Sequence, residues 1–403
     1  EGLLNMRPAA VSELAEALCK LFLGYFAAYF TVRLTGDVAL GAAAAIFGIT
    51  VGTAAAALYL WLYNRIKGDG ITARQIAESP EREEGTVAVK GLMLISLSVA
   101  AASLSSNIPL IADAVTVKRS LSGLDYEALS GIRHIYAAGY SVSDISVSQL
   151  PTFLYGVKSK AYTLYNLVPS FVSVLAVGSV PVISACFAAK DWERLNININ
   201  SALKLSGVIS FPAGVGIIVL NSRITALLYG GAYPSGAADM AALFGAAALF
   251  AGPAVLLTAV LQAVGRHNRA LVNIAIGTAV KLCVNLTVGI ESVNINGAAL
   301  GTLAFYAAVC LLNIFSLIGI KIKPDITGSI IKPFAAAVVC GAAAYAVSLV
   351  SRGKTAALFA ILIAALVYLI MLFSLKVLNE SDFYLLTKSE KAVKFCRKHR
   401  IIS

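Results

Sequence analysis

The chain has 403 residues, of which 59% are hydrophobic and only 13% are charged, and its mean hydropathy is +0.82. A water-soluble chain carries about 25% charged residues, so an ordinary soluble globular protein is excluded. The formal net charge is +11, but the basic residues lie mostly between apolar stretches and at the C-terminus, where membrane proteins carry their topology signal. We therefore expect a membrane protein without a nucleic-acid partner.

Apolar stretches of about 20 residues or more follow one another along the chain, each long enough to cross a hydrocarbon layer of about 30 Å. They do not alternate polar and apolar residues as the strands of a membrane β-barrel do. The sequence therefore predicts an all-α, polytopic membrane protein with about ten transmembrane helices. The predicted helices are Val11–Leu34, Val38–Tyr63, Gly91–Val117, Thr152–Ala188, Ile197–Leu220, Ala237–Val264, Leu271–Ile290, Gly297–Ile320, Gly328–Val350 and Ala356–Leu378.

The Lys and Arg residues between these helices predict their orientation. If the first residues are cytoplasmic, the loops on that side carry 20 Lys and Arg, against 9 on the opposite side. This bias predicts that both ends of the chain are cytoplasmic. The basic tail at 379–403 is weakly amphipathic, so it is either a helix lying on an anionic inner leaflet or a solvated end of the last helix.

Two distant helical hairpins resemble each other. The segment VSELAEALCKLFLGYF…VALGAAAAIF is similar to LVNIAIGTAVKLCVNL…AALGTLAFYA, with Lys20 matched to Lys281 at a spacing of 261 and Gly41 matched to Gly301 at a spacing of 260. This pattern indicates an internal duplication of the kind seen in transporters. Four helices precede the second hairpin within its half, so we expect four more helices before Glu1 and about fourteen in all.

The duplication predicts how the chain is divided. We expect the last two helices of an N-terminal lobe at 1–63, a cytoplasmic linker at 64–90, a six-helix C-terminal lobe at 91–320, an extra helix pair at 321–378 and the basic tail at 379–403. Glycine pairs with GxxxG spacing, Gly48/Gly52 and Gly297/Gly301, predict close helix packing. Prolines inside the predicted helices predict bends that a rocking transporter could use; they are Pro109, Pro169, Pro181, Pro212 and Pro253.

Motifs of soluble enzymes are missing from the sequence. The three histidines are far apart and form no HExxH motif, the stretch SRGKT at 351–355 lacks the first glycine of a phosphate loop, and the six cysteines form no CxxC pair. We therefore expect a protein that is not an enzyme and has no metal site and no cofactor.

Ionisable residues inside the predicted helices are costly unless they face a cavity or a partner. Glu13, Glu16 and Lys20 share one face of the first helix, and Asp113, Lys204 and Lys281 lie in other helices. They favour a polar cavity. The alternative is that Glu16 and Lys20 pair within their helix, while Lys204 and Lys281 bond backbone carbonyls or extend toward the interface.

Further cations lie near the ends of two predicted helices. Lys158 and Lys160 begin the fourth helix in LYGVKSKAYTLYN, and Lys118 and Arg119 follow the third. Such a set suits an anionic ligand, because Lys and Arg hold phosphate by charge and directed donors; the alternative is anchoring at the membrane interface. The candidate substrate-binding residues are therefore Lys158, Lys160, Lys118, Arg119, Asp113, Glu16, Lys20, Lys204 and Lys281.

Several segments resemble the SpoVB- and MurJ-type members of the multidrug, oligosaccharidyl-lipid and polysaccharide (MOP) exporter superfamily, with the SpoVB branch nearest. They are NMRPAAVSELAEALCKLFLGYFAAYF, IPLIADAVTVKRSL, LYGVKSKAYTLYNLVPSFVSVLAVGSVPVISACFAAKDWERL, SGVISFPAGVGIIVL, AVLQAVGRHNRALVNIAIGTAVKL, NINGAALGT and LNESDFYLL. In this resemblance Lys158 and Lys160 match the start of the eighth family helix, and Asp113, Lys118 and Arg119 match the end of the seventh. Two features depart from the family: the first four helices, with several cavity cations, are absent, and the segment 120–150 is longer than usual.

The resemblance implies a fourteen-helix, two-lobe MOP/MATE-like flippase of the bacterial cytoplasmic membrane, here N-terminally truncated. It implies translocation of a lipid-linked, diphosphate-bearing precursor such as lipid II by alternating access, in cell-wall, spore-cortex or polysaccharide synthesis. The final helix pair is associated in this family with a groove for the lipid tail. Partners would be the anionic precursor, membrane lipids and the missing helices. The alternatives are a cation-coupled multidrug (MATE-like) exporter, disfavoured by the mainly basic helix ends, and a membrane enzyme, disfavoured because the long loops carry no catalytic cluster.

Overall fold

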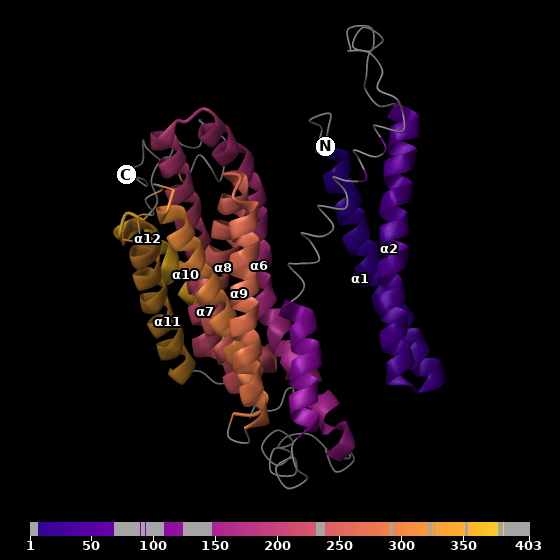
Figure 1. The fold of residues 1–403 in the computed structure, drawn as a ribbon. Coiled ribbons are helices and arrows are strands. Elements are labelled where there is room, and N and C mark those ends of the chain that lie inside the picture. Colours follow the sequence, from indigo (N-terminus) through magenta and orange to yellow (C-terminus); the bar gives the residue numbers. More distant parts are fainter. Residues whose placement is uncertain are drawn as a thin grey trace. The chain divides into compact units, whose positions relative to one another are not determined.

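A computed structural model describes residues 7–67, 89, 93, 109–123, 147–230, 238–290, 293–320, 322, 325, 327–350, 354–377 and 382. Across these residues the secondary structure is helical apart from short turns and links (Figure 1). Nine helices within the described ranges are long and apolar enough to cross a membrane, which confirms the predicted all-α, multi-pass fold. The chain divides into two compact units, one ending at Ile95 and the other beginning at Ser96.

The first unit contains a helical hairpin of α1 (Arg7–Thr35) and α2 (Val38–Lys67), which pack along each other. The Asp37 carboxylate accepts a hydrogen bond from the backbone N–H of Ala39 at 2.7 Å and so caps the start of α2. A Cβ atom on Gly48 would lie 2.6 Å from Cα of Gly24, and one on Gly52 would lie 3.0 Å from the carbonyl oxygen of Glu16. The two backbones approach closely at these glycines, which confirms the packing predicted from Gly48 and Gly52.

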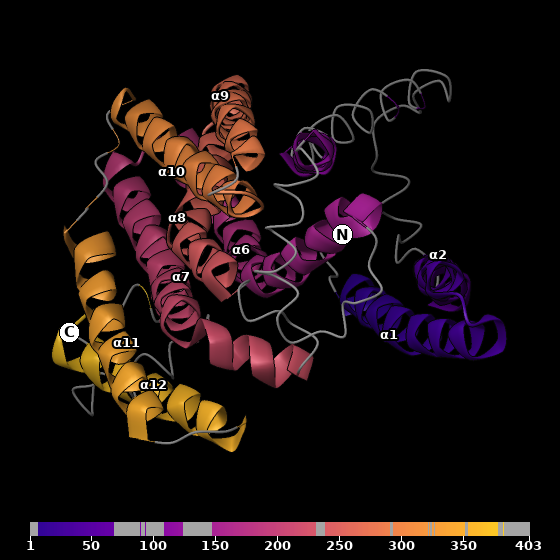
Figure 2. The same ribbon diagram turned by 90° about the horizontal axis from the view of Figure 1, so that it is seen from below.

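The second unit is a bundle of long helices around α8 (Figure 2). The small and apolar side chains of α8 are buried against α6, α7, α9 and α10. A helix at residues 109–122 precedes them; it ends five residues past the predicted end of the third span, whose earlier part lies outside the described residues. The helices of the bundle are α6 (Leu150–Ala188), α7 (Trp192–Tyr229), α8 (Ala238–Ala263), α9 (His267–Asn285) and α10 (Asn296–Ile318).

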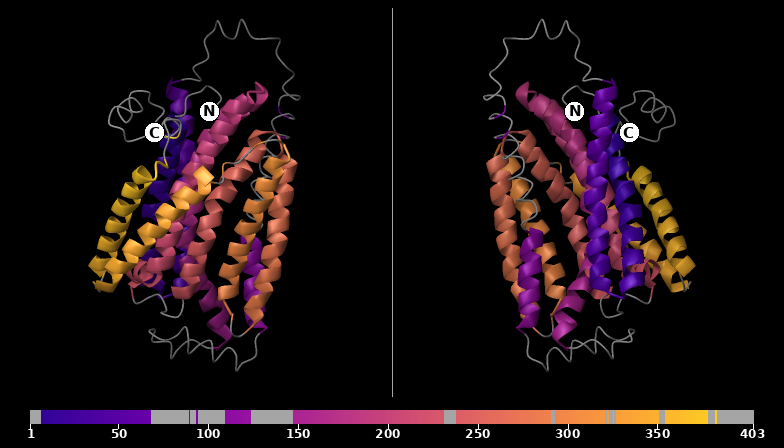
Figure 3. Two further views of the ribbon diagram at one scale, coloured as in Figure 1. Left: turned by 90° about the vertical axis from the view of Figure 1, so that its left-hand side faces the viewer. Right: turned by 90° about the vertical axis from the view of Figure 1, so that its right-hand side faces the viewer.

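The last two helices, α11 (Lys332–Val350) and α12 (Lys354–Ser374), pack on each other and on α7 (Figures 2 and 3). One π-helical turn, Thr327–Ile331, leads into α11. The Ser329 hydroxyl donates to the carbonyl of Asn200 at 3.0 Å, the Arg223 guanidinium donates to the carbonyl of Ser348, and the Tyr368 hydroxyl donates to the carbonyl of Val208 at 3.1 Å. Hydrogen bonds thus attach α7 to the π-helical turn, to α11 and to α12.

Helices α6 and α7 have 39 and 38 residues, or nearly 60 Å at about 1.5 Å per residue. Both therefore exceed a hydrocarbon layer of about 30 Å. Pro169 and Pro181 lie inside α6 and Pro212 lies inside α7, as the sequence predicted. The predicted fifth span ends at Leu220, where α7 has a kink with φ −105° and ψ 17°; a second helical segment continues from the kink to Tyr229.

Candidate functional site

Three helices of the second unit meet at one buried carboxylate. Oδ2 of Asp113, on the helix at 109–122, lies 2.6 Å from Nζ of Lys158 on α6 and 3.1 Å from Nζ of Lys281 on α9. Its other oxygen, Oδ1, accepts a hydrogen bond from the side-chain amide of Asn285 at 2.9 Å. All four residues are buried. We call Asp113, Lys158, Lys281 and Asn285 the Asp113 cluster.

The local sequence explains why these side chains converge. Lys281 and Asn285 are four residues apart in α9, so they lie on one face of that helix. Asp113 and Thr116 are three residues apart and share a face in the same way, and the Asn285 amide also lies 3.1 Å from the Thr116 hydroxyl. A Cβ atom on Gly301 of α10 would collide with Oδ1 of Asn285. Gly301 is therefore needed for the site, and its contact confirms the close packing predicted from its GxxxG spacing.

The two lysines of the Asp113 cluster also contact aromatic rings. Nζ of Lys158 lies 5.0 Å from the centre of the Tyr155 ring and 5.5 Å from that of Tyr162, and Nζ of Lys281 lies 5.9 Å from that of Phe305. Ring faces attract cations within about 6 Å. These rings carry no formal charge. Among the described residues one carboxylate forms ion pairs with two ammonium groups, so the cluster carries a formal charge of +1.

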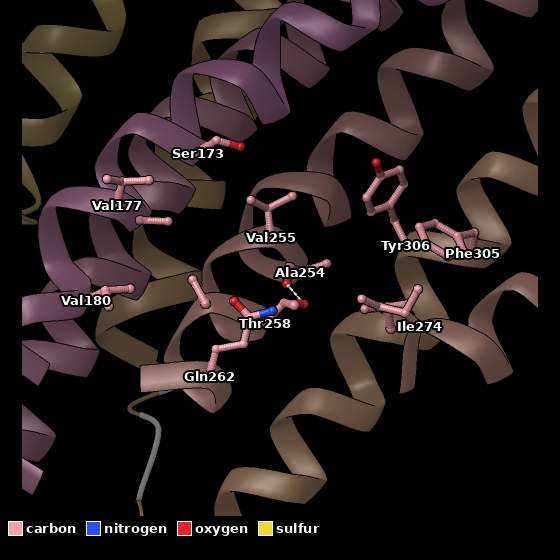
Figure 4. Close-up of a pocket in the computed structure, with 13 residues that line it drawn as sticks. Ser173, Val177, Val180, Ala254, Val255, Thr258, Gln262, Ile274, Phe305 and Tyr306 are labelled. Carbon is pink, nitrogen blue, oxygen red and sulfur yellow. Dashed lines mark hydrogen bonds between the residues drawn. The ribbon is translucent and has the colours of Figure 1, made fainter. Parts of the chain in front are cut away.

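Two cavities adjoin each other near this cluster. A cavity of 160 Å³ is lined by Pro109, Leu110, Tyr162, Asn166, Lys281, Thr302, Phe305 and Tyr306. A larger cavity of 390 Å³ shares Phe305 and Tyr306 with the first. Figure 4 shows its walls, with Ser173, Val177 and Val180 on one side and Ile274, Phe305 and Tyr306 on the other. The rings of Phe305 and Tyr306 therefore separate a small cavity with a cation from a larger, mostly apolar one.

A polar network of asparagines lies beside the larger cavity. The side-chain amide of Asn273 donates to Oδ1 of Asn313 at 2.9 Å and to the Ser316 hydroxyl at 3.0 Å. The Asn313 amide donates in turn to the Thr258 hydroxyl, a lining residue of that cavity, at 2.8 Å. These bonds tie α8, α9 and α10 together, because buried polar groups are costly unless they are hydrogen-bonded.

An apolar groove of 580 Å³ lies between α6, α7 and the α11–α12 pair. Its lining is aliphatic and aromatic, and none of the described residues that line it is charged. Residues that form its walls include Leu167, Phe171, Val208, Pro212, Leu220, Ile224, Gly341, Ala344, Ala365 and Tyr368. The groove is therefore suited to a hydrocarbon chain.

The structure separates other candidate cations from the Asp113 cluster. Lys160 is half-buried, its Nζ lies 5.7 Å from the centre of the Tyr229 ring, and its backbone carbonyl accepts a hydrogen bond from the Tyr229 hydroxyl at 2.9 Å. Lys118 and Arg119 are exposed near the end of the helix at 109–122. Lys158 and Lys160 are two residues apart, and positions at that spacing do not face each other on a helix. The structure therefore places these two candidate residues in different surroundings.

The remaining candidates form separate ion pairs. Nζ of Lys204, on α7, lies 2.7 Å from Oδ2 of Asp382, and both side chains are buried. In the first unit Nζ of Lys20 lies 2.5 Å from Oε1 of Glu16, which also accepts a hydrogen bond from the Thr53 hydroxyl at 3.0 Å. The intrahelical pairing of Glu16 and Lys20, proposed as an alternative from the sequence, is therefore confirmed.

Asn285 and Asp382 were missed as site residues from the sequence. Asn285 could have been found as the residue four positions after Lys281, on the same helix face. Asp382 belongs to the LNESDFYLL segment, and its carboxylate could have been suspected because a buried lysine needs a partner. Among the described residues, no group of three or more His, Cys, Asp or Glu could hold a metal ion.

Comparisons with known proteins agree with this architecture. The model of the lipid II flippase MurJ family matches residues 162–374, which is more than half of the chain. The uncharacterized membrane protein YabM of Bacillus subtilis (strain 168) is 27% identical over 318 residues, covering 79% of this chain and 54% of that protein. The lipid II flippase MurJ of the same organism is 26% identical over 144 residues, covering 35% of this chain and 26% of that protein. The chain thus spans about half the length of YabM and a smaller share of MurJ.

A solved structure shows the same fold. It is a lipid II flippase MurJ in an inward closed conformation, which this chain matches with a TM-score of 0.55 at 16% identity, covering 94% of this chain and 68% of the other. The match confirms the MurJ-like architecture expected from the sequence. Together with the family match over residues 162–374, it leads to one conclusion: the chain belongs to the MurJ lipid II flippase family.

Proposed function

We propose that this protein moves a lipid-linked, diphosphate-bearing glycan precursor, similar to lipid II, across the bacterial cytoplasmic membrane by alternating access. No covalent bond is made or broken in such a step. Membership of the MurJ family supports the proposal. So does the similarity to the Bacillus subtilis MurJ, which is a lipid II flippase.

One structural observation carries the proposal. The second unit combines a buried cationic cluster with a long apolar groove. A lipid-linked diphosphate needs both features, because its head is anionic and its tail is a hydrocarbon. Ammonium groups hold phosphate oxygens by charge and directed hydrogen bonds, while the groove between α7 and the α11–α12 pair can bury the tail without a polar contact. The candidate residues Lys158, Lys281 and Asp113, which are buried here, are proposed to meet the diphosphate only in another state of the alternating-access cycle, in which the site is open.

The geometry does not favour the cation-coupled drug exporter. Such a transporter needs a carboxylate that is free to bind a cation, and Asp113 is a buried carboxylate in contact with Lys281, which lines the 160 Å³ cavity. Oδ2 of Asp113 already contacts two ammonium groups and Oδ1 accepts the Asn285 amide. A coupling cation at this position would have to displace a lysine.

The proposal extends to the topology of the chain. Both ends are proposed to be cytoplasmic, the α1–α2 hairpin to belong to an N-terminal lobe, and α11–α12 to be the extra helix pair. The positive charges between the helices support this orientation. Membership of the SpoVB branch and a role in sporulation remain predictions.

Single cysteines test the orientation in a chain whose six natural cysteines are replaced by alanine. Thr35→Cys lies at the end of α1 and Glu193→Cys lies in the first turn of α7, and both positions are exposed. The proposed topology places residue 35 outside and residue 193 in the cytoplasm. A membrane-impermeant thiol reagent added to intact cells should therefore label Thr35→Cys and spare Glu193→Cys. The reverse pattern would contradict the orientation.

The transport proposal is tested with the purified chain in liposomes that contain a fluorescent lipid-linked diphosphate oligosaccharide. Wild-type protein should speed the movement of this lipid between leaflets relative to protein-free liposomes, while a phosphatidylcholine probe should not respond. The variant Ala365→Phe places a ring in the apolar groove and should slow the movement, whereas Ala342→Phe, at an exposed alanine of α11 that does not line the groove, should not. Equal movement with and without wild-type protein would contradict the proposal.

A further inference from the structure

We infer that the 160 Å³ cavity beside Lys281 binds one small monovalent inorganic anion, such as chloride. This inference goes beyond the proposed function, because the ligand is a free ion and not the transported lipid. It rests on the charge of the Asp113 cluster, on the donors that line the cavity and on the cavity's size.

The charge of the cluster calls for a counter-ion. Asp113 contributes one negative charge, and Lys158 and Lys281 contribute two positive charges, all at side chains that are almost fully buried. Across the described ranges, no second carboxylate forms an ion pair with either lysine. An uncompensated charge in the membrane interior is costly, and one bound monovalent anion would make the group neutral.

The cavity offers suitable donors to such an anion. Lys281 is the charged residue among the described residues that line it. An ammonium group has three N–H donors, and within the described part of the chain the Lys281 ammonium contacts Asp113, at 3.1 Å, and the Phe305 ring. Tyr162 and Asn166 add a hydroxyl and a side-chain amide to the lining. Because Asn166 is exposed and Lys281 is buried, the cavity leads from the surface to the ammonium group.

The size of the cavity selects the class of ligand. A volume of 160 Å³ corresponds to roughly five water molecules at about 30 Å³ each. Pockets for small organic molecules begin at about 300 Å³, so a glycan head group is too large. Pro109, Leu110 and Phe305 form an apolar part of the wall. A partly dehydrated ion with a few waters fits this space.

The Lys204–Asp382 pair provides a matched control. It is also a buried lysine with a carboxylate, at 2.7 Å, and Lys204 does not line the cavity beside Lys281. Lys281→Gln removes the surplus charge and the main donor, and leaves Asp113 paired with Lys158. Lys204→Gln leaves the Asp113 cluster intact.

The experiment measures thermal unfolding of the purified full chain in detergent, in sodium chloride and in sodium gluconate of equal ionic strength. Gluconate is too large for the cavity. Wild-type protein and Lys204→Gln should unfold several degrees higher in chloride, because a ligand that binds the folded state stabilises it. Lys281→Gln should unfold at the same temperature in both salts. In crystals grown with bromide, an anomalous peak should lie within hydrogen-bond distance of Nζ of Lys281.

Three outcomes would overturn the inference. Wild-type protein that unfolds equally in both salts has no such site, and the surplus charge is then removed in another way, such as loss of a proton. A chloride effect that persists in Lys281→Gln is a general salt effect. A bromide peak that lies elsewhere, with no density beside Lys281, places the anion outside this cavity.

Discussion

The second unit contains two buried lysine sites that differ in their charge balance. At Lys204 one ammonium faces one carboxylate, Asp382, at 2.7 Å. At the Asp113 cluster two ammonium groups face one carboxylate, at 2.6 and 3.1 Å, and one of them lines a cavity. The Lys204–Asp382 pair joins a residue beyond α12 to α7 and contains one charge of each sign. The unbalanced cluster keeps a positive charge for a ligand, which distinguishes a candidate binding site from a structural contact.

The largest expected effect comes from removing each carboxylate. Asp113→Asn leaves two buried lysines without their ion-pair partner, whereas Asp382→Asn leaves one. Breaking a buried pair costs about 3–5 kcal/mol, so Asp113→Asn should lower the free energy of unfolding by at least that amount and by more than Asp382→Asn. Equilibrium unfolding of the purified chain, followed by circular dichroism, measures both. A larger loss in Asp382→Asn would contradict the comparison.

Replacing a whole pair by apolar residues sharpens the comparison. The double variant Lys204→Met/Asp382→Leu removes both charges, and such replacements are often neutral or stabilising. The variant Asp113→Leu/Lys158→Met also removes a pair, but it leaves Lys281 buried with no carboxylate. We expect the first to unfold like the wild type and the second to lose about 3 kcal/mol. Similar unfolding free energies in the two double variants would show that Lys281 is not held by Asp113.

A smaller effect is expected at the glycine that gives Asn285 its space. Gly301→Ala places a methyl group against the Asn285 carboxamide, and overpacking of this kind costs about 1–3 kcal/mol. Gly156→Ala is the control, since a Cβ atom there meets nothing within 4 Å and alanine stabilises a helix by about 0.5–1 kcal/mol relative to glycine. Equilibrium unfolding followed by circular dichroism compares the unfolding free energies of the two glycine variants. A neutral Gly301→Ala would mean that Asn285 can move away from Asp113 at little cost.

The smallest effects are expected at the cations outside both sites. Lys160→Gln loses a contact with the Tyr229 ring, and such contacts contribute about 0.5–1 kcal/mol where water reaches them. Lys118→Gln changes an exposed residue and should stay within about 0.5 kcal/mol of the wild type. Lys158→Gln, in contrast, disturbs the Asp113 cluster. If Lys160→Gln abolished lipid movement in liposomes at unchanged stability, Lys160 would be a residue that the substrate contacts.

Much of the fold could be predicted from the sequence, because membrane-spanning helices are set by apolar length. The predicted Ala237–Val264 agrees with α8 (Ala238–Ala263) within one residue at each end. Helix ends beyond the hydrocarbon layer are less constrained by hydropathy. The predicted fifth span ends at Leu220, the kink of α7, and does not include the second helical segment, which continues to Tyr229. The predicted division of the chain into lobes and linker remains a prediction.

The candidate site could be predicted only as a set of residues. Asp113, Lys204 and Lys281 could be identified because burying a charge is costly in any fold. Their partners could not, because these depend on the fold: the packing of three helices that are far apart in the sequence brings Lys158 and Lys281 to Asp113. Lys158 and Lys160 looked equivalent for the same reason: their different environments depend on which neighbouring helix each one faces.

The apolar groove has a consequence for the distance over which a lipid tail can be held. Its wall on α7 runs from Val208 to the kink at Leu220, which is about 18 Å at about 1.5 Å per residue, and Ile224 continues it beyond the kink. The part before the kink is more than half the thickness of a hydrocarbon layer of about 30 Å. The tail of the proposed lipid substrate could turn over in this groove while it stays in contact with apolar side chains. The protein would then need a polar passage for the head group alone.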